Sequence, residues 1–76
     1  MKIHVKLMGM LKDRMPPEGT IELPDDDATI EKALAELEIP VDTVQVFSVN
    51  GSIQRDLAKR LQEGDELTVV PPVGGG

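Results

Sequence analysis

The sequence predicts a small α+β domain in which a four- to five-stranded mixed sheet is packed on one main helix. Two observations lead to this class. Residues 2–8 alternate between apolar and polar side chains, which is the period of a strand with one buried face. Residues 29–37 are the only long segment with helical spacing, because apolar residues recur at i, i+3, i+4 and i+7 from Ile30 to Leu37. One helix of this length covers one face of such a sheet, so we expect two layers.

The first half of the chain is divided by turn and breaker residues. Residues 9–19 contain two adjacent prolines and are predicted to form a loop. A short strand over residues 20–23 is then expected to return beside the first strand as a hairpin. Thr29 is a favourable N-cap for the helix, and Pro40 is predicted to end it.

The second half is predicted to supply the remaining strands. Residues 44–49 are rich in β-branched side chains, and the Asn50-Gly51 pair that follows is the strongest short hairpin signal. Ser52 and Ile53 begin the return strand. We expect one short helical turn over residues 56–61, a turn at Gly64-Asp65 and a last strand over residues 67–70.

Composition excludes several classes of function. The chain has 76 residues and no cysteine, so it forms one small domain without disulfides or thiolate metal sites, and its single histidine cannot build a zinc site. Fourteen acidic against eight basic residues give a net charge of −6, which disfavours nucleic acid and anionic membranes and favours a basic protein partner. Phe47 is the only aromatic residue, which excludes a base-stacking surface. Without a long apolar stretch, we expect a cytoplasmic protein with no membrane segment.

The C-terminal end is the most informative feature for function. We expect a domain over residues 1–70 and a flexible tail over residues 71–76, since two prolines cannot donate to a neighbouring strand. Val73 is followed by Gly74, Gly75 and Gly76, and glycine allows backbone to approach another surface closely. The α-carboxylate of Gly76 is then an anionic group at the end of a segment without side chains, which fits a narrow active site. A frayed end without function is the alternative interpretation.

The helix at 29–37, the Val49-Asn50-Gly51 turn, the 64–67 segment and the 71–76 end together resemble the β-grasp, ubiquitin-like sulfur carriers of the MoaD and ThiS type. The resemblance covers nearly the whole chain. It implies a carrier and not an enzyme: an ATP-dependent, ubiquitin-activating-like enzyme adenylates the Gly76 carboxylate, and a sulfur donor converts the acyl-adenylate to a thiocarboxylate. It also implies that no cofactor is bound and that the activating partner uses the ATP.

The resemblance implies two acceptor pathways. Residues 71–73 and 9–19 look like MoaD, which works with a synthase large subunit in molybdopterin synthesis, while the short length and residues 49–55 look like ThiS, which works with a thiazole synthase. We favour the molybdopterin type, in which residues 70–76 are predicted to leave the sheet and insert into the partner. The chain departs from typical MoaD in lacking longer additions, from ThiS in its long first loop, and from both in its third glycine, Gly74.

Two further functions stay open. One is a protein modifier, in which Gly76 forms an isopeptide bond with lysines of target proteins. The other is a plain interaction domain whose tail has no role. The carrier and the modifier differ in their product, which is a thiocarboxylate in one case and higher-mass conjugates in the other.

A partner-docking patch is predicted on the sheet face that points away from the helix. If Phe47, Val49, Leu67 and Val69 point at the helix, the opposite face carries an apolar group. Its predicted members are Met8, Val46, Val70, Pro71 and Pro72. A register shift of one residue would reverse this assignment. The nearby methionines at 8, 10 and 15, with Leu11, are interpreted either as an adaptable partner surface or as loop packing.

Two polar features are predicted to be structural. Asp25, Asp26 and Asp27 lack the alternating spacing of a calcium loop, and their place before the helix is explained by its dipole. His4 falls on the polar face of its strand without a titratable partner, so we expect a solvated surface residue.

Overall fold

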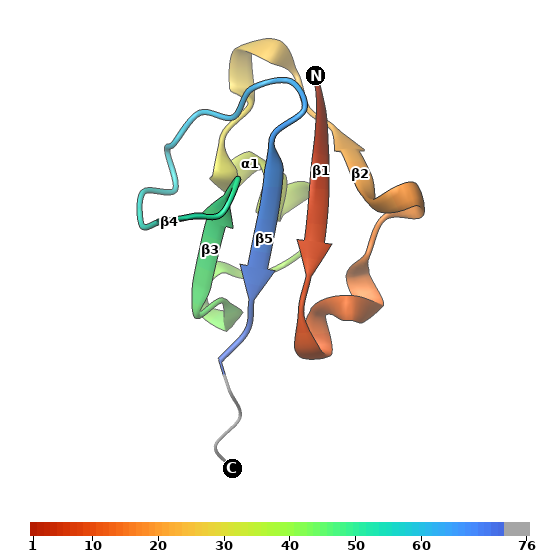
Figure 1. The fold of residues 1–76 in the computed structure, drawn as a ribbon, viewed down its shortest axis with the longest axis vertical. Coiled ribbons are helices and arrows are strands. Elements are labelled where there is room, and N and C mark those ends of the chain that lie inside the picture. Colours follow the sequence, from red (N-terminus) through yellow and green to blue (C-terminus); the bar gives the residue numbers. More distant parts are fainter. Residues whose placement is uncertain (73–76) are drawn as a thin grey trace.

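The computed structural model describes residues 1–72, and it has the predicted two-layer α+β architecture (Figure 1). Five strands form one mixed sheet in the order β2-β1-β5-β3-β4. The strands are β1 (Lys2–Leu7), β2 (Thr20–Glu22), β3 (Val46–Val49), β4 (Ser52–Gln54) and β5 (Glu66–Val70), and the one α-helix of the described part is α1 (Ile30–Glu36). The last strand therefore lies at the centre of the sheet, where it pairs in parallel with β1 and antiparallel with β3.

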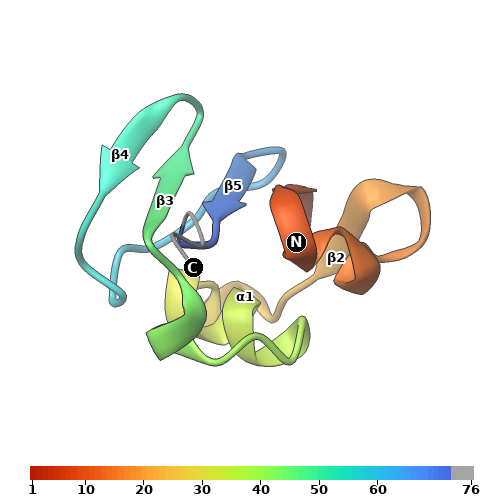
Figure 2. The same ribbon diagram turned by 90° about the horizontal axis from the view of Figure 1, so that it is seen from below.

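The helix covers one face of the sheet, and the opposite face is open to solvent (Figure 2). The core lies between the two layers. The alternation in β1 places Ile3, Val5 and Leu7 in it, and each is at most 5% exposed. The facing apolar side chains come from α1 and the other central strands: Ile30, Ala33, Leu34, Phe47, Val49, Leu67 and Val69. The predicted strand register is thus confirmed.

Helix α1 begins as expected and ends earlier than expected. The Thr29 hydroxyl oxygen accepts a hydrogen bond from the Lys32 amide at 3.1 Å, which confirms the N-cap. At the other end the Ile39 amide donates to the Leu34 carbonyl and the Glu38 amide to Ala35, with Glu38 at φ 58°. This is a Schellman motif, so the left-handed residue Glu38 ends the helix before Pro40 is reached.

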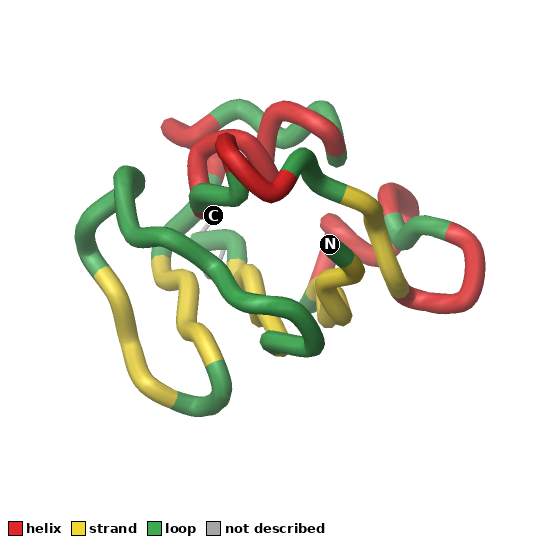
Figure 3. Tube along the Cα trace, turned by 90° about the horizontal axis from the view of Figure 1, so that it is seen from above, coloured by secondary structure: helices red, strands yellow, loops and turns green. Residues whose placement is uncertain are grey.

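The connections contain more local structure than the sequence predicted. The segment 9–19 is not a plain loop, because it forms the 3₁₀ helices η1 (Gly9–Arg14) and η2 (Pro17–Gly19). Two further 3₁₀ helices, η3 (Asp25–Asp27) and η4 (Val41–Thr43), flank α1 in the chain (Figure 3). None of the helices within residues 1–72 has the length and apolar character needed to cross a membrane.

The helical turn predicted over residues 56–61 is wrong. Leu57 and Ala58 instead form the middle of a turn that the Lys59 amide closes by donating to the Asp56 carbonyl at 3.0 Å. The side chain of Asp56 stabilises the same turn, because its carboxylate accepts a hydrogen bond from the Ala58 amide at 2.9 Å. A short acceptor side chain can bond the backbone two residues on, and this local bond competes with helix formation.

The N-terminal ammonium gives the fold a pH-dependent contact. It donates to the Leu23 carbonyl at 2.6 Å and to the Asp25 carboxylate at 3.1 Å. The hydrogen bond to Asp25 raises the pKa of this ammonium above its ordinary value near 8.0, and desolvation opposes the shift. A raised folded-state pKa stabilises the fold fully below the unfolded pKa, and this contribution is lost as pH rises through the folded value.

We therefore expect the melting temperature to fall as pH rises above about 8, and Asp25→Asn to reduce this fall. The effect is small and weakens with salt, because Asp25 is 86% exposed. Thermal unfolding of both proteins at several pH values checks the expectation. Parallel pH profiles of the two proteins would show that the contact contributes nothing.

Candidate functional site at the tail root

The chain leaves the sheet at Pro71, the first residue of the predicted tail over residues 71–76. Val70 is still part of the central strand, because its carbonyl accepts a hydrogen bond from the Gln45 amide at 2.8 Å. On the other side, the Met8 amide donates to the Val69 carbonyl at 3.1 Å. Pro71 has no amide hydrogen to continue the ladder. In the chain alone, the segment outside the sheet therefore begins at Pro71. The detachment of Val70 on insertion into a partner stays a prediction.

Pro71 is the first residue of the tail, and it is buried against the domain. We call it the tail root. It packs against Gly9, the first residue of η1. A Cβ on Gly9 would lie 3.1 Å from Cγ of Pro71, and Gly9 has φ 55°, so both contact and conformation favour glycine at this position. The assignment of Pro71 to an exposed docking patch is thus corrected, whereas Pro72 is exposed.

The reactive part of the predicted site lies beyond this root. Val73, Gly74, Gly75 and Gly76 are outside the described residues. The predicted role of the Gly76 carboxylate is therefore not tested by the geometry. What the described residues establish is the place from which the tail starts, at the end of the central strand.

An apolar group lies beside this root on the solvent face of the sheet, as the register predicted. Val46 is directly opposite Val70, and both are half-buried. Met8, which follows β1, lies next to Val70 and is 37% exposed. We call Met8, Val46 and Val70 the outer-face patch. Its use in docking remains a prediction.

One neighbour of the outer-face patch was not predicted from the sequence. Ile53 is 65% exposed on the edge strand β4 and pairs with Ser48, so it lies on the same face of the sheet as Val46. The signal was present in the sequence, because the two-residue Asn50-Gly51 turn fixes the register of the hairpin. Counting back from that turn places Ile53 opposite Ser48.

The polar residues that the sequence analysis singled out lie at the surface of the domain. Within residues 1–72 no polar or charged residue is buried, and no three potential metal ligands lie together. Asp25 pairs with the N-terminal ammonium, and His4 is exposed. The outer face of the sheet at this end of the domain thus carries an apolar surface beside the tail root.

Val46→Asp tests the outer-face patch. We expect it to weaken binding to the adenylating enzyme that the resemblance implies by about tenfold or more, because it places a charge in the centre of an apolar contact. Ser52→Asp is the matched control, since it adds the same charge on the edge strand, outside the patch. Isothermal titration measures the affinities, and circular dichroism checks that both variants fold. Equal weakening by the two variants would mean that net charge, and not the patch, matters.

The mixed five-stranded sheet, the single main helix and the central C-terminal strand define a ubiquitin-like β-grasp protein. The family model of the ThiS family matches residues 5–76, that is, nearly the whole chain and its tail. The chain belongs to the ThiS family.

Solved structures with the same fold come from archaea and bacteria. SAMP1 of Haloferax volcanii, also described as small archaeal modifier protein 1, is 24% identical with a TM-score of 0.74, and each chain is covered to 100%. The HVO 2177 protein of the same organism is 27% identical with a TM-score of 0.70, over 100% of this chain and 87% of the other. A chain of the complex of subunits 1 and 2 of the molybdopterin-converting factor from Helicobacter pylori is 22% identical with a TM-score of 0.63, with both chains covered to 100%. No curated protein gives a match.

Proposed function

We propose that this chain is a sulfur carrier whose C-terminal carboxylate, on Gly76, becomes a thiocarboxylate. The observation that carries the proposal is the tail root: the chain leaves the central strand at a buried proline and runs into three glycines, within the segment that matches the ThiS family. The carboxylate oxygen attacks the α-phosphate of ATP and pyrophosphate leaves. A sulfur nucleophile from the donor then attacks the acyl-adenylate and AMP leaves.

This chemistry needs little from the carrier itself. A carboxylate is a poor acyl electrophile, and adenylation supplies the leaving group that splits a difficult step into two easier ones. The adenylating enzyme binds the ATP, and the carrier contributes the carboxylate and a surface by which the enzyme recognises it. We therefore assign no catalytic residue and no bound cofactor to this chain.

A protein modifier is the second candidate. It is supported by the likeness to a structure described as an archaeal modifier protein. The activation of Gly76 is the same in both cases. In the modifier, a lysine amine of the target attacks the carbonyl of the acyl-adenylate, the amine loses a proton, AMP leaves and an isopeptide bond forms.

The acceptor of the sulfur also belongs to the proposal. We favour a molybdopterin-type synthase large subunit over a thiazole synthase. The H. pylori structure, in which two subunits of a molybdopterin-converting factor form a complex, supports this choice at the level of fold. Reconstitution with the two acceptor systems, each given the thiocarboxylated chain, decides between them. Sulfur transfer to the thiazole system alone would overturn the choice and leave the carrier function in place.

Intact-mass spectrometry tests the proposed function. The chain is incubated with the adenylating enzyme of its own organism, ATP and a sulfur donor. We expect a mass gain equal to the exchange of one oxygen for sulfur, only when ATP is present. Conjugates of higher mass without this gain, in an extract of the same organism, would favour the modifier. No change in either assay would leave only the plain interaction domain.

A further inference from the structure

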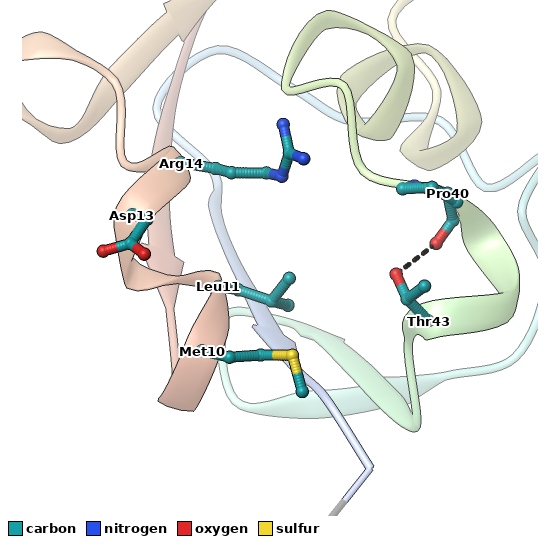
Figure 4. A pocket seen from close by; sticks show the side chains of 6 residues that line it. All are labelled: Met10, Leu11, Asp13, Arg14, Pro40 and Thr43. Carbon is teal, nitrogen blue, oxygen red and sulfur yellow. Dashed lines mark hydrogen bonds between the residues drawn. The ribbon is translucent and has the colours of Figure 1, made fainter.

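A groove lies at the same end of the molecule as the tail root. It is formed between η1 and η4 and lined by Met10, Leu11, Asp13, Arg14, Pro40 and Thr43 (Figure 4). Because β1 runs parallel to β5, the segment η1 that follows β1 lies at the end where β5 stops. Because β3 runs antiparallel to β5, η4, which precedes β3, lies at that end too. The groove and the tail root therefore lie at the same end of the molecule, and a protein that contacts the tail root comes close to this end (Figure 1).

Large exposed apolar residues are frequent in and beside the two 3₁₀ helices that form this groove, and Met10 is the one among them that lines it. Of the five large apolar residues that are exposed in residues 1–72, four belong to η1, its two flanking positions or η4: Met8, Met10, Met15 and Val41. Met10 is 71% exposed, and its side chain points into the groove (Figure 4). Large exposed apolar groups of this kind mark contact surfaces, and methionine adapts its shape to a partner.

The groove also carries a cation without a partner in the described part of the chain. The Arg14 guanidinium points into it, whereas the side chain of the neighbouring Asp13 points away (Figure 4). Arg14 forms neither an ion pair nor a side-chain hydrogen bond with any residue from 1 to 72. The Thr43 hydroxyl is already used, since it donates to the Pro40 carbonyl at 2.7 Å. On a chain of net charge −6, this cation is complementary to a carboxylate, which arginine binds through two parallel hydrogen bonds.

We propose that this groove is a second docking site, separate from the outer-face patch, for the adenylating enzyme. It receives a segment of that enzyme which presents a carboxylate to Arg14 and an apolar side chain to Met10 and Leu11. This inference rests on the proposed activation of Gly76 and adds where the activating protein holds the carrier. The two contacts together give specificity. A protein surface that has only the carboxylate, or only the apolar side chain, makes one of the two contacts and binds more weakly.

Charge reversal within η1 tests the groove. The assay is ATP–pyrophosphate exchange by the recombinant adenylating enzyme of the same organism, measured against carrier concentration. We expect Arg14→Glu to raise KM by about tenfold or more while kcat changes little, because the contact is made in binding and not in chemistry. Lys12→Glu is the matched control: it makes the same charge change on the same 3₁₀ helix, is exposed, and does not line the groove. We expect it to change KM by less than about threefold. Arg14→Lys should restore part of the affinity.

Each other outcome has a defined meaning. No exchange with the unaltered chain would overturn the proposed function and this inference with it. Normal exchange with an unchanged KM for Arg14→Glu, or an equal effect of Lys12→Glu, would overturn the groove alone. A lower KM for Arg14→Glu would overturn it too, and would mean that the groove holds the chain's own terminal carboxylate and must release it. Sedimentation that shows a dimer lost in Arg14→Glu would instead assign the groove to a second copy of the chain.

Discussion

A chain extended by a short tag beyond Gly76 is expected to lose adenylation completely while its melting temperature stays unchanged. The acyl-adenylate forms only at a free terminal carboxylate, and the tag moves this group away from Gly76. Stability is unaffected because the hydrogen-bonded sheet ends at Val70. ATP–pyrophosphate exchange and thermal unfolding measure the two properties on the same samples.

Deletion of Gly76 is the companion variant. It leaves a chain that ends in Gly74-Gly75, so the end is still a diglycine but the carboxylate is drawn back by about 3.3–3.6 Å. We expect adenylation to be lost here as well, with the fold intact. The control is the same tag placed at the N-terminus and removed by a protease before the assay. Continued exchange by the chain with the C-terminal tag would remove the basis of the proposed function.

Leu34→Ala is expected to cost the domain a large part of its stability. Leu34 lies in the middle of α1 and is 1% exposed between the helix and the sheet. Its truncation removes buried apolar surface and leaves a cavity, which costs about 2–5 kcal/mol of unfolding free energy. A domain of this length has about 4–11 kcal/mol in total by the usual per-residue scaling, so the variant approaches unfolding.

Denaturant unfolding followed by circular dichroism measures this loss, since the chain has no tryptophan for fluorescence. Glu36→Ala is the control on the exposed side of α1. It removes only the Lys32–Glu36 ion pair, 3.8 Å long, and is expected to cost less than about 0.5 kcal/mol. A loss below about 1 kcal/mol for Leu34→Ala would contradict the assignment of this helical face to the core.

The features that the sequence predicted are those in which a local pattern and the tertiary fold agree. The alternation of β1, the apolar positions of α1 and the Thr29 cap each need only neighbouring residues to be recognised, and each is confirmed. The Asn50-Gly51 turn is another such feature, with φ 52° and 87° at its two residues, and it sets the β3–β4 hairpin. The ThiS-type resemblance followed from the combination of these elements with the glycine tail.

The features that the sequence did not predict depend on contacts between distant residues or on unusual backbone. Glu38 ends α1 in a left-handed conformation that glycine usually adopts at this position. Because the residue is glutamate, the sequence carried no signal for this helix end. The burial of Pro71 arises from its contact with Gly9, more than sixty residues earlier in the chain. The Arg14 groove likewise exists only because the sheet order brings η1 and η4 to one end.

The central position of β5 has a consequence for how the protein is made. Strands β2 and β1 form one half of the sheet and β3 and β4 the other, and β5 is the strand that pairs with both halves. The sheet therefore cannot close until the residues through Val70 have left the ribosome. Pairing between residues so distant in sequence is slow to form and leaves shorter chains unfolded. A chain cut before Glu66 therefore exposes its apolar residues and is open to proteolysis, so the copies that persist in a cell are those in which the tail root is present.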